Sequence, residues 1–322
     1  MSLLLPANLV EIFVGGLRAG IDVDEGPTSQ QVSVLTAITT HLWQRPDLDV
    51  SQVPFIGPER LAEALVEPQQ REMFHELHLT LEACRHPQSP AQVELVQHYA
   101  EVLGVTGEDL AMFRDLVTEG VETAAQDYQR FLKTNLAERF EPSLIDVAVD
   151  PQHPELALAE KLGLFAEYAP DTLGRAYLGF YERFGLTLPG LEASSINHFF
   201  VSHDMTHTIA GISTTVAGEV ALSAFQFAMN NNRINRAALL ASLVAHEAGF
   251  AHPAHLRTAD TAALADHQAT LLLARELRRG SACTDDFSLV DHFDLAPLPL
   301  DEVRRAFGVQ APTDPHDAHH WW

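Results

Sequence analysis

The chain has 322 residues, a length that suggests about two domains, and it carries a formal net charge of -24 at pH 7. Only 20 residues are Lys or Arg, and binding to nucleic acid needs a basic surface, so we expect no nucleic-acid partner. Two cysteines, Cys84 and Cys283, fall far apart, which argues against a disulfide framework and is compatible with a reducing compartment.

The N-terminal half shows helix signals almost throughout. Residues 3–17 are apolar but lack preceding basic residues and are interrupted by polar positions, which favours an amphipathic helix over a signal peptide. Further helix starts are predicted at Thr28, which has capping-box spacing with Gln31, and at Pro58 and Pro90. Because strand signals are scarce along the whole chain, we predict an all-α protein with two helical domains.

Residues 89–116 are predicted to form a helix, a tight turn containing glycine, and a second helix. This pair resembles the TerB-like module of tellurite-resistance proteins, so residues 1–140 are predicted to be an N-terminal helical domain of that type. The alternative is a helical packing or dimerisation domain without chemistry. Prolines between residues 141 and 154 indicate a linker region, since prolines at this density stop helices.

The second half contains the densest group of metal-type ligands in the sequence. His203 and His207 are four residues apart and would lie on one face of a helix, with Asp204 beside them. Glu219 follows twelve residues after His207, roughly 18 Å away on a straight helix. We therefore predict that the first helix ends near Gly211 and that a second helix carries Glu219 back.

The break itself has local signals. After Gly211, a typical helix stop, Ser213, Thr214 and Thr215 are candidate N-caps for the second helix. Glu219 is the only charged residue in a run from Thr208 to Met229, and burying one carboxylate without a partner is costly.

Two imidazoles and two carboxylates form a donor set that would suit zinc and would also admit magnesium, manganese or iron. The alternative is an accidental HDxxH string whose side chains form ordinary hydrogen bonds.

Three segments of the second half resemble the Coq-four family of ubiquinone biosynthesis. They are the pattern HDxxH-x11-E at residues 203–219, the segment PDTLGRAY at 170–177, and the segment LDEVRRAFG at 300–308. The resemblance implies a helical domain over residues 141–310, followed by a tail at 311–322. Arg175, in the second segment, is a candidate catalytic residue that could meet a carboxylate or phosphate of a ligand, or else form a salt bridge with a neighbour.

The resemblance also implies a function. The family's reaction is the metal-dependent loss of the ring C1 carboxylate, with hydroxylation at that carbon, of a polyprenylated precursor derived from 4-hydroxybenzoate. The resemblance also implies a divalent metal, with zinc as the first candidate, held by His203, Asp204, His207 and Glu219. Expected partners are an isoprenoid lipid, other proteins of quinone biosynthesis and a second copy of the chain in a homo-oligomer.

Two alternatives belong to other functional classes. One is a non-catalytic prenyl-lipid-binding scaffold of a quinone-biosynthesis complex, in which any metal would be structural. The other is an HD-type metal-dependent phosphohydrolase, which would need a further aspartate in the metal shell, with Asp260 and Asp266 available.

We expect a cytoplasmic protein that attaches peripherally to membranes, because a prenyl tail partitions into the bilayer and no segment is a convincing membrane span. The charge of -24 opposes binding to anionic lipid, so attachment would have to come from apolar area. Candidate surfaces are the helix at residues 3–17 and the pair Trp321 and Trp322, in a stretch that is predicted to be an exposed end.

Overall fold

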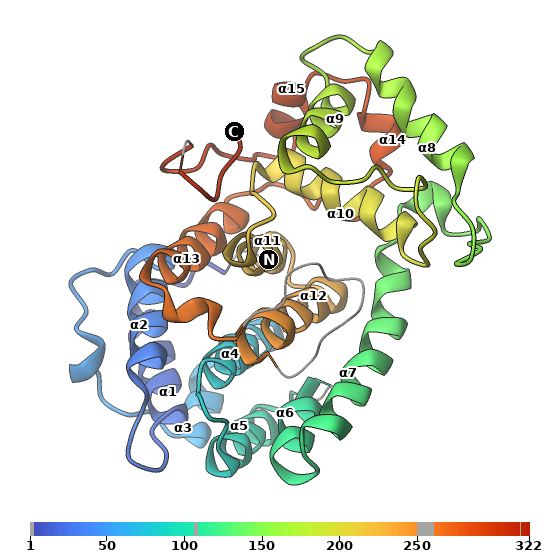
Figure 1. The fold of residues 1–322 in the computed structure, drawn as a ribbon. Helices are drawn as coiled ribbons and strands as arrows, with labels where there is room; N and C mark the ends of the chain where they lie inside the picture. Colours follow the sequence, from blue (N-terminus) through green and yellow to red (C-terminus); the bar gives the residue numbers. More distant parts are fainter. Residues whose placement is uncertain (1–2, 106–108, 250–260, 316) are drawn as a thin grey trace. The chain divides into compact units, whose positions relative to one another are not determined.

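The computed structural model describes residues 3–105, 109–249, 261–315 and 317–322. These residues form helices connected by turns and loops, and none of them belongs to a strand (Figure 1). Two isolated bridges, Thr172 with Pro299 and Ile212 with His320, are the β-type pairings in this part of the chain. The all-α prediction is confirmed.

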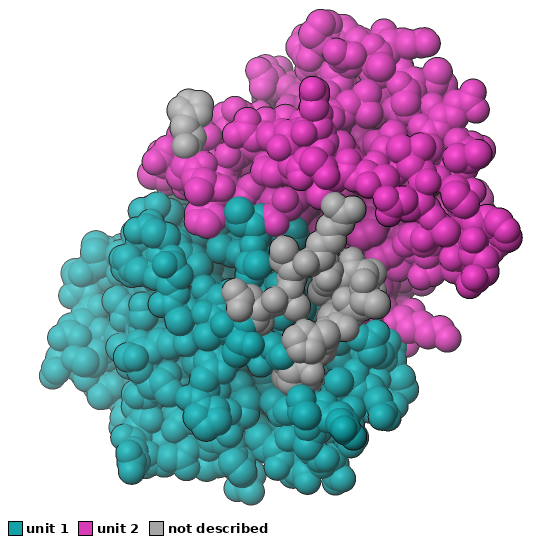
Figure 2. Space-filling view, viewed as in Figure 1, with its two compact units in different colours: residues 1–131, 215–281 teal, residues 132–214, 282–322 magenta. Residues whose placement is uncertain are grey.

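The chain divides into two compact units, which we call unit 1 and unit 2 (Figure 2). Unit 1 comprises residues 1–131 and 215–281, and unit 2 comprises residues 132–214 and 282–322. The predicted domains, 1–140 and 141–310 with a tail at 311–322, are consecutive stretches, whereas each compact unit is built from two segments. The predicted domain boundaries stay a prediction.

Unit 1 contains most of the helices. They are α1 (Ala7–Gly20), α2 (Ser29–Ala37), α3 (Pro58–Ala64), α4 (Pro68–Ala83), α5 (Pro90–Leu103), α6 (Asp109–Thr118), most of α7 (Val121–Leu136), α11 (Val216–Met229), α12 (Arg233–Leu243) and α13 (His267–Ser281). Helices α11 and α13 pack against each other along their length. Gly280 of α13 faces the backbone carbonyl of Phe225, and a Cβ built at Gly280 would lie 2.1 Å from that oxygen.

Several helix starts in unit 1 follow the local signals in the sequence. Thr28 caps α2 by accepting from the backbone N–H of Gln31, whose side chain accepts from the N–H of Thr28, as the capping-box spacing predicts. Ser89 caps α5 by accepting from the backbone N–H of Gln92, with Pro90 as the first helical residue. Helix α5 ends at Gly104, which has a left-handed backbone, so the predicted helix and glycine turn are confirmed. The TerB-like relationship stays a prediction.

Helix α1 forms where the sequence predicts an amphipathic helix, but most of its apolar side chains are buried. Val10, Phe13, Val14 and Leu17 are all at most 1% exposed. The Phe13 ring packs edge-on against the rings of Trp43 and Phe74 within unit 1. The prediction that α1 offers a free apolar face to a membrane is therefore wrong, because that face is part of the unit 1 core.

Unit 2 contains the remaining helices. They are the last turn of α7, then α8 (Leu156–Gly163), α9 (Leu173–Phe184), α10 (Asn197–Ala210), α14 (His292–Leu295) and α15 (Leu300–Ala306). The pair Glu141 and His292 is fully buried and joins the start of this unit to α14. Among the described residues of both units, no helix combines the length and the apolar character needed to cross a membrane.

Candidate metal centre

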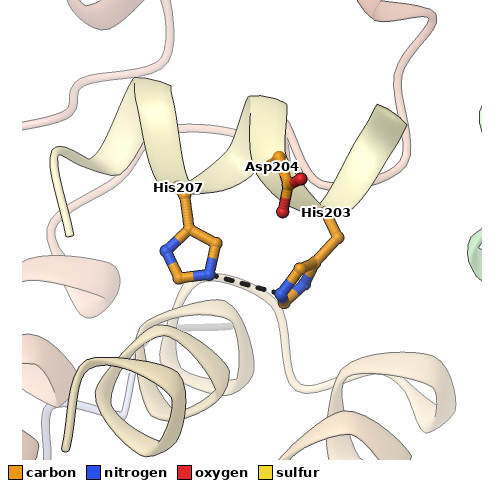
Figure 3. A group of neighbouring side chains, drawn as sticks. All are labelled: His203, Asp204 and His207. Carbon is orange, nitrogen blue, oxygen red and sulfur yellow. Dashed lines mark hydrogen bonds between the residues drawn. The ribbon is translucent and has the colours of Figure 1, made fainter. Parts of the chain in front are cut away.

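Helix α10 carries His203, Asp204 and His207, which we call the His-Asp-His cluster (Figure 3). One ligand atom of each residue lies within 4.8 Å of the others, so the three side chains could hold a metal ion. The Nε2 atoms of the two histidines are 3.2 Å apart, and both rings project from the same side of the helix (Figure 3). This is the arrangement that the four-residue spacing predicts.

The helix carrying the cluster ends where the sequence predicts. α10 stops at Ala210, and Gly211 follows with a φ of 68°, a left-handed conformation that favours glycine. α11 then starts at Val216, and the hydroxyl of Thr215 caps it by accepting from the N–H of Gly218 at 3.1 Å. The predicted break between the two helices is confirmed.

His207 is fully buried and its ring orientation is fixed. Its Nδ1 atom is 2.9 Å from the carbonyl oxygen of Ile212, so in the neutral imidazole Nδ1 carries the hydrogen and donates it. The lone pair of Nε2 then points toward His203, as a metal ligand requires. The Phe180 ring of α9 stacks on this imidazole, with the centroids 5.5 Å apart.

His203 is half-buried and stacks on the ring of Phe199, one turn earlier in α10, with the centroids 4.8 Å apart. Two imidazole nitrogens and one carboxylate suit zinc, and the same donor set also admits magnesium, manganese or iron. The geometry therefore fits a divalent metal. No local signal in the sequence indicates that the ring of Phe180 packs on His207.

Asp204 is only 6% exposed and accepts a hydrogen bond from the phenol of Tyr181 on α9. The hydroxyl of Tyr177 donates in turn to the Tyr181 oxygen, at 3.3 Å. Burial, and then the nearby carboxylate of Asp204, raise the pKa of Tyr181 well above its ordinary value. Tyr181 therefore stays protonated and remains a donor to Asp204. No local signal in the sequence indicates the contact between Tyr181 and Asp204.

Glu219 lies in the first turn of α11, in unit 1, and is half-buried. The sequence argument treated it as a carboxylate buried in an apolar run, whereas it is partly exposed. A carboxylate in the first turn is also favoured by the helix dipole. The role of Glu219 as a fourth ligand stays a prediction.

Arg175 lies in the first turn of α9, and its guanidinium donates to the carbonyl oxygen of Ala166 at 2.8 Å. This contact is neither the predicted ligand contact nor a salt bridge. A catalytic role for Arg175 stays a prediction.

Two of the segments that carry the Coq-four resemblance, 170–177 and 300–308, lie in unit 2, and the third, 203–219, belongs to unit 2 as far as residue 214. At the start of α9, the N–H of Gly174 donates to the carbonyl of Ala296 at 2.9 Å, and the N–H of Leu300 at the start of α15 donates to the carbonyl of Asp171 at 2.8 Å. Arg304 of α15 donates through Nε to the carbonyl of Ile209 at 3.0 Å. This bond gives one of the last carbonyls of α10 a hydrogen-bond partner.

Other acidic and histidine side chains in the sequence have separate roles. His198, on α10, is buried and its Nε2 lies 2.8 Å from the Glu155 carboxylate. Asp266 accepts from the backbone N–H groups of Gln268 and Ala269 at the start of α13, which is a helix-capping role. Asp260, the other aspartate considered for a phosphohydrolase, lies outside the described residues.

The fold and the cluster define an all-helical protein with a candidate metal centre. No protein-family model matches the sequence, and no curated protein matches it. The structure is similar to the crystal structure of a protein from Nostoc punctiforme PCC 73102 that is named as a candidate ubiquinone biosynthesis protein. The two chains are 16% identical, the match covers 74% of this chain and 97% of that chain, and the TM-score is 0.33. At that identity and TM-score, the similarity assigns neither a family nor a function.

Proposed function

We propose that this protein binds a divalent metal through His203, Asp204 and His207, with Glu219 as a further ligand, and acts in ubiquinone biosynthesis. The proposed reaction is the loss of the ring C1 carboxylate of a polyprenylated aromatic acid as CO2, with hydroxylation at that carbon. This is a two-electron oxidation, and the proposed oxidant is molecular oxygen from solution. The observation that supports metal binding is the pair of Nε2 atoms 3.2 Å apart beside a buried carboxylate. The proposed pathway comes from the sequence resemblance. The packing of residues 170–177, residues 300–308 and the HDxxH part of the third segment within unit 2 is consistent with a shared site.

The chain's own residues would prepare this site in three ways. The Ile212 carbonyl selects the His207 tautomer in which Nε2, the atom that faces His203, carries the lone pair. Tyr181 donates to one oxygen of Asp204 and restricts the orientation of that carboxylate. Phe180 and Phe199 cover the two imidazoles and limit access of water. When bound, the metal would act as a Lewis acid on a carboxylate or phenolic oxygen of the substrate.

Metal content is the first test. Purified protein would be analysed for metals and titrated with Zn²⁺ against a chromophoric chelator, for the wild type and for His203→Ala, His207→Ala and Glu219→Gln. We expect the two histidine variants to lose tight binding, since each removes one ligand atom. His198→Ala is the matched control, because it removes a buried histidine of the same helix that lies outside the cluster.

Turnover is the second test. The protein would be incubated with a 4-hydroxybenzoate derivative carrying a short prenyl tail, and carboxylate loss and ring hydroxylation would be followed by mass spectrometry. Product formation that persists in metal-free His203→Ala protein would refute the proposal. A prenyl lipid that copurifies with a protein showing metal binding but no turnover would support the scaffold alternative instead.

We also propose that the protein reaches its lipid substrate by peripheral attachment to the membrane. Because most apolar residues of α1 are buried, the proposed attachment uses another surface or a partner among the quinone-biosynthesis proteins. Liposome flotation at low and high salt tests this. Recovery of all the protein in the bottom fraction under both conditions would show that a partner delivers the substrate.

A further inference from the structure

The last residues of the sequence pack beside the end of α10. We call residues Asp317–Trp322 the C-terminal clamp. The backbone N–H of Trp321 donates to the Gly211 carbonyl at 2.7 Å, and the N–H of Ser213 donates to the His319 carbonyl at 2.9 Å. Ile212 and His320 lie between these two bonds and form a bridge. The predicted exposed end is therefore wrong, because this segment pairs with residues 211–213.

The clamp holds the peptide groups on both sides of Ile212. The Ile212 carbonyl is the acceptor for Nδ1 of His207, at 2.9 Å. The Ile212 carbonyl and the Ser213 N–H belong to one planar peptide group, so the bond from Ser213 to His319 restrains the direction of that carbonyl. The bond from Trp321 to Gly211 restrains the preceding peptide group. The clamp thus fixes the hydrogen bond that selects the tautomer and orientation of a candidate metal ligand.

Contacts between side chains also link the clamp to His207. The ring of Trp321 lies against the ring of Phe180, with the centroids 5.7 Å apart. Phe180 in turn stacks on the imidazole of His207, at 5.5 Å. Removing Trp321 would leave Phe180 without this neighbour and allow its ring, and that of His207, to move.

The clamp is itself held in place. Asp317 accepts from the N–H of His319 at 2.8 Å, and its carboxylate lies 2.9 Å from Nδ1 of His320, which is buried. The guanidinium of Arg304 lies over the Trp322 ring, 3.7 Å from the centroid, while its Nε binds the end of α10. These contacts tie the clamp, α15 and α10 together within unit 2.

We propose that the C-terminal clamp positions His207 for metal binding, with Trp321 as its main positioning residue. This inference rests on the proposed function, since it requires that His207 binds a metal. Outer contacts that orient a ligand histidine typically change metal affinity by about 10-fold to 100-fold when they are lost. We therefore expect Trp321→Ala to weaken Zn²⁺ binding by about 10-fold.

The experiment compares Zn²⁺ affinity, by competition with a chelator, and the visible spectrum of the Co²⁺-loaded protein. Trp321→Ala is expected to weaken Zn²⁺ binding and to shift the Co²⁺ bands, while Trp321→Phe, which keeps an aromatic ring, restores both. The control is Leu162→Ala, a buried residue of α8 that contributes nothing to the cluster. It is expected to lower the melting temperature without changing either metal readout. If Trp321→Ala does not fold, Trp321→Leu is measured in its place.

The outcomes separate the two proposals. A wild type that binds neither Zn²⁺ nor Co²⁺ overturns the proposed function. A wild type that binds Zn²⁺, together with a Trp321 variant of equal affinity and unchanged Co²⁺ spectrum, overturns the clamp inference alone. The clamp inference also fails if Leu162→Ala weakens binding as much as Trp321→Ala does, since the effect would then reflect stability.

Discussion

The phenol of Tyr181 donates a hydrogen bond to the carboxylate of Asp204, and so joins α9 to the candidate metal centre on α10. The two residues are 23 positions apart in the sequence. The contact gives Asp204 a fixed partner inside the protein and restricts the directions in which its oxygens can face a metal ion.

Tyr181→Phe removes this donor while keeping the ring in place. We expect Zn²⁺ affinity to fall by about 10-fold, because the Asp204 carboxylate loses its orientation. Chelator competition measures the change, and circular dichroism checks that the helices remain. Tyr177→Phe is the control, since its hydroxyl reaches Asp204 only through Tyr181 and should have a smaller effect. Equal affinity of Tyr181→Phe and wild type would show that Asp204 needs no such support.

A second prediction concerns pH and Glu82 in α4. Burial raises the pKa of this carboxyl to about 8 from 4.5, and its Oε1 has no hydrogen-bond partner among the described residues. Between these two pH values the folded state holds a proton that the unfolded state has released, so stability falls as pH rises. The slope from this one group is about 1.4 kcal/mol per pH unit.

Glu82→Gln abolishes this ionisation with little change of shape. Urea unfolding at several pH values should show the variant gaining stability relative to the wild type from pH 5 to pH 8. Glu94→Gln, at an exposed position of α5, is the control and should track the wild type. A constant difference between Glu82→Gln and wild type across this range would mean that Glu82 does not carry the proton.

A third prediction concerns the buried pair in unit 2. Oε2 of Glu141 lies 2.9 Å from Nδ1 of His292, Oε1 accepts from the His292 backbone N–H, and Nε2 of His292 lies 2.9 Å from the Phe287 carbonyl. Removing one partner leaves an uncompensated buried charge or polar group, which typically costs about 3–5 kcal/mol.

The test is a double-mutant cycle with Glu141→Leu, His292→Phe and the double variant. We expect each single change to destabilise by about 3 kcal/mol and the double variant to lose clearly less than the sum. Urea unfolding supplies the free energies. Additive losses would mean that the two side chains contribute independently.

A fourth prediction concerns the close approach of α11 and α13. Gly280→Ala would place a Cβ 2.1 Å from the carbonyl oxygen of Phe225 and 2.9 Å from its carbonyl carbon. The obstacle is backbone, so the helices must separate, and we expect a loss of at least about 1–3 kcal/mol. Gly163→Ala is the control, because nothing lies within 4 Å of its added Cβ. It should be neutral or stabilising by up to about 1 kcal/mol. Equal melting temperatures for the two variants would contradict the tight packing.

The sequence by itself determined the features that depend on neighbouring residues. The caps at Thr28, Ser89 and Thr215 and the stop at Gly211 were predictable, because each uses hydrogen bonds or backbone angles within about one helical turn. The shared face of His203 and His207 was predictable for the same reason, since a four-residue spacing fixes it in any helix.

Only the tertiary structure decided which distant residues meet. Tyr181 with Asp204, Trp321 with Phe180, and Gly280 with Phe225 are contacts between separate helices or segments, and no local signal in the sequence names the partner. The same holds for α1, because its pattern of apolar residues is compatible both with a helix that lies on a membrane and with a helix that packs into a core. Burial of apolar area is non-directional, so a pattern shows that a face will be covered, while only the packing of the whole chain decides what covers it.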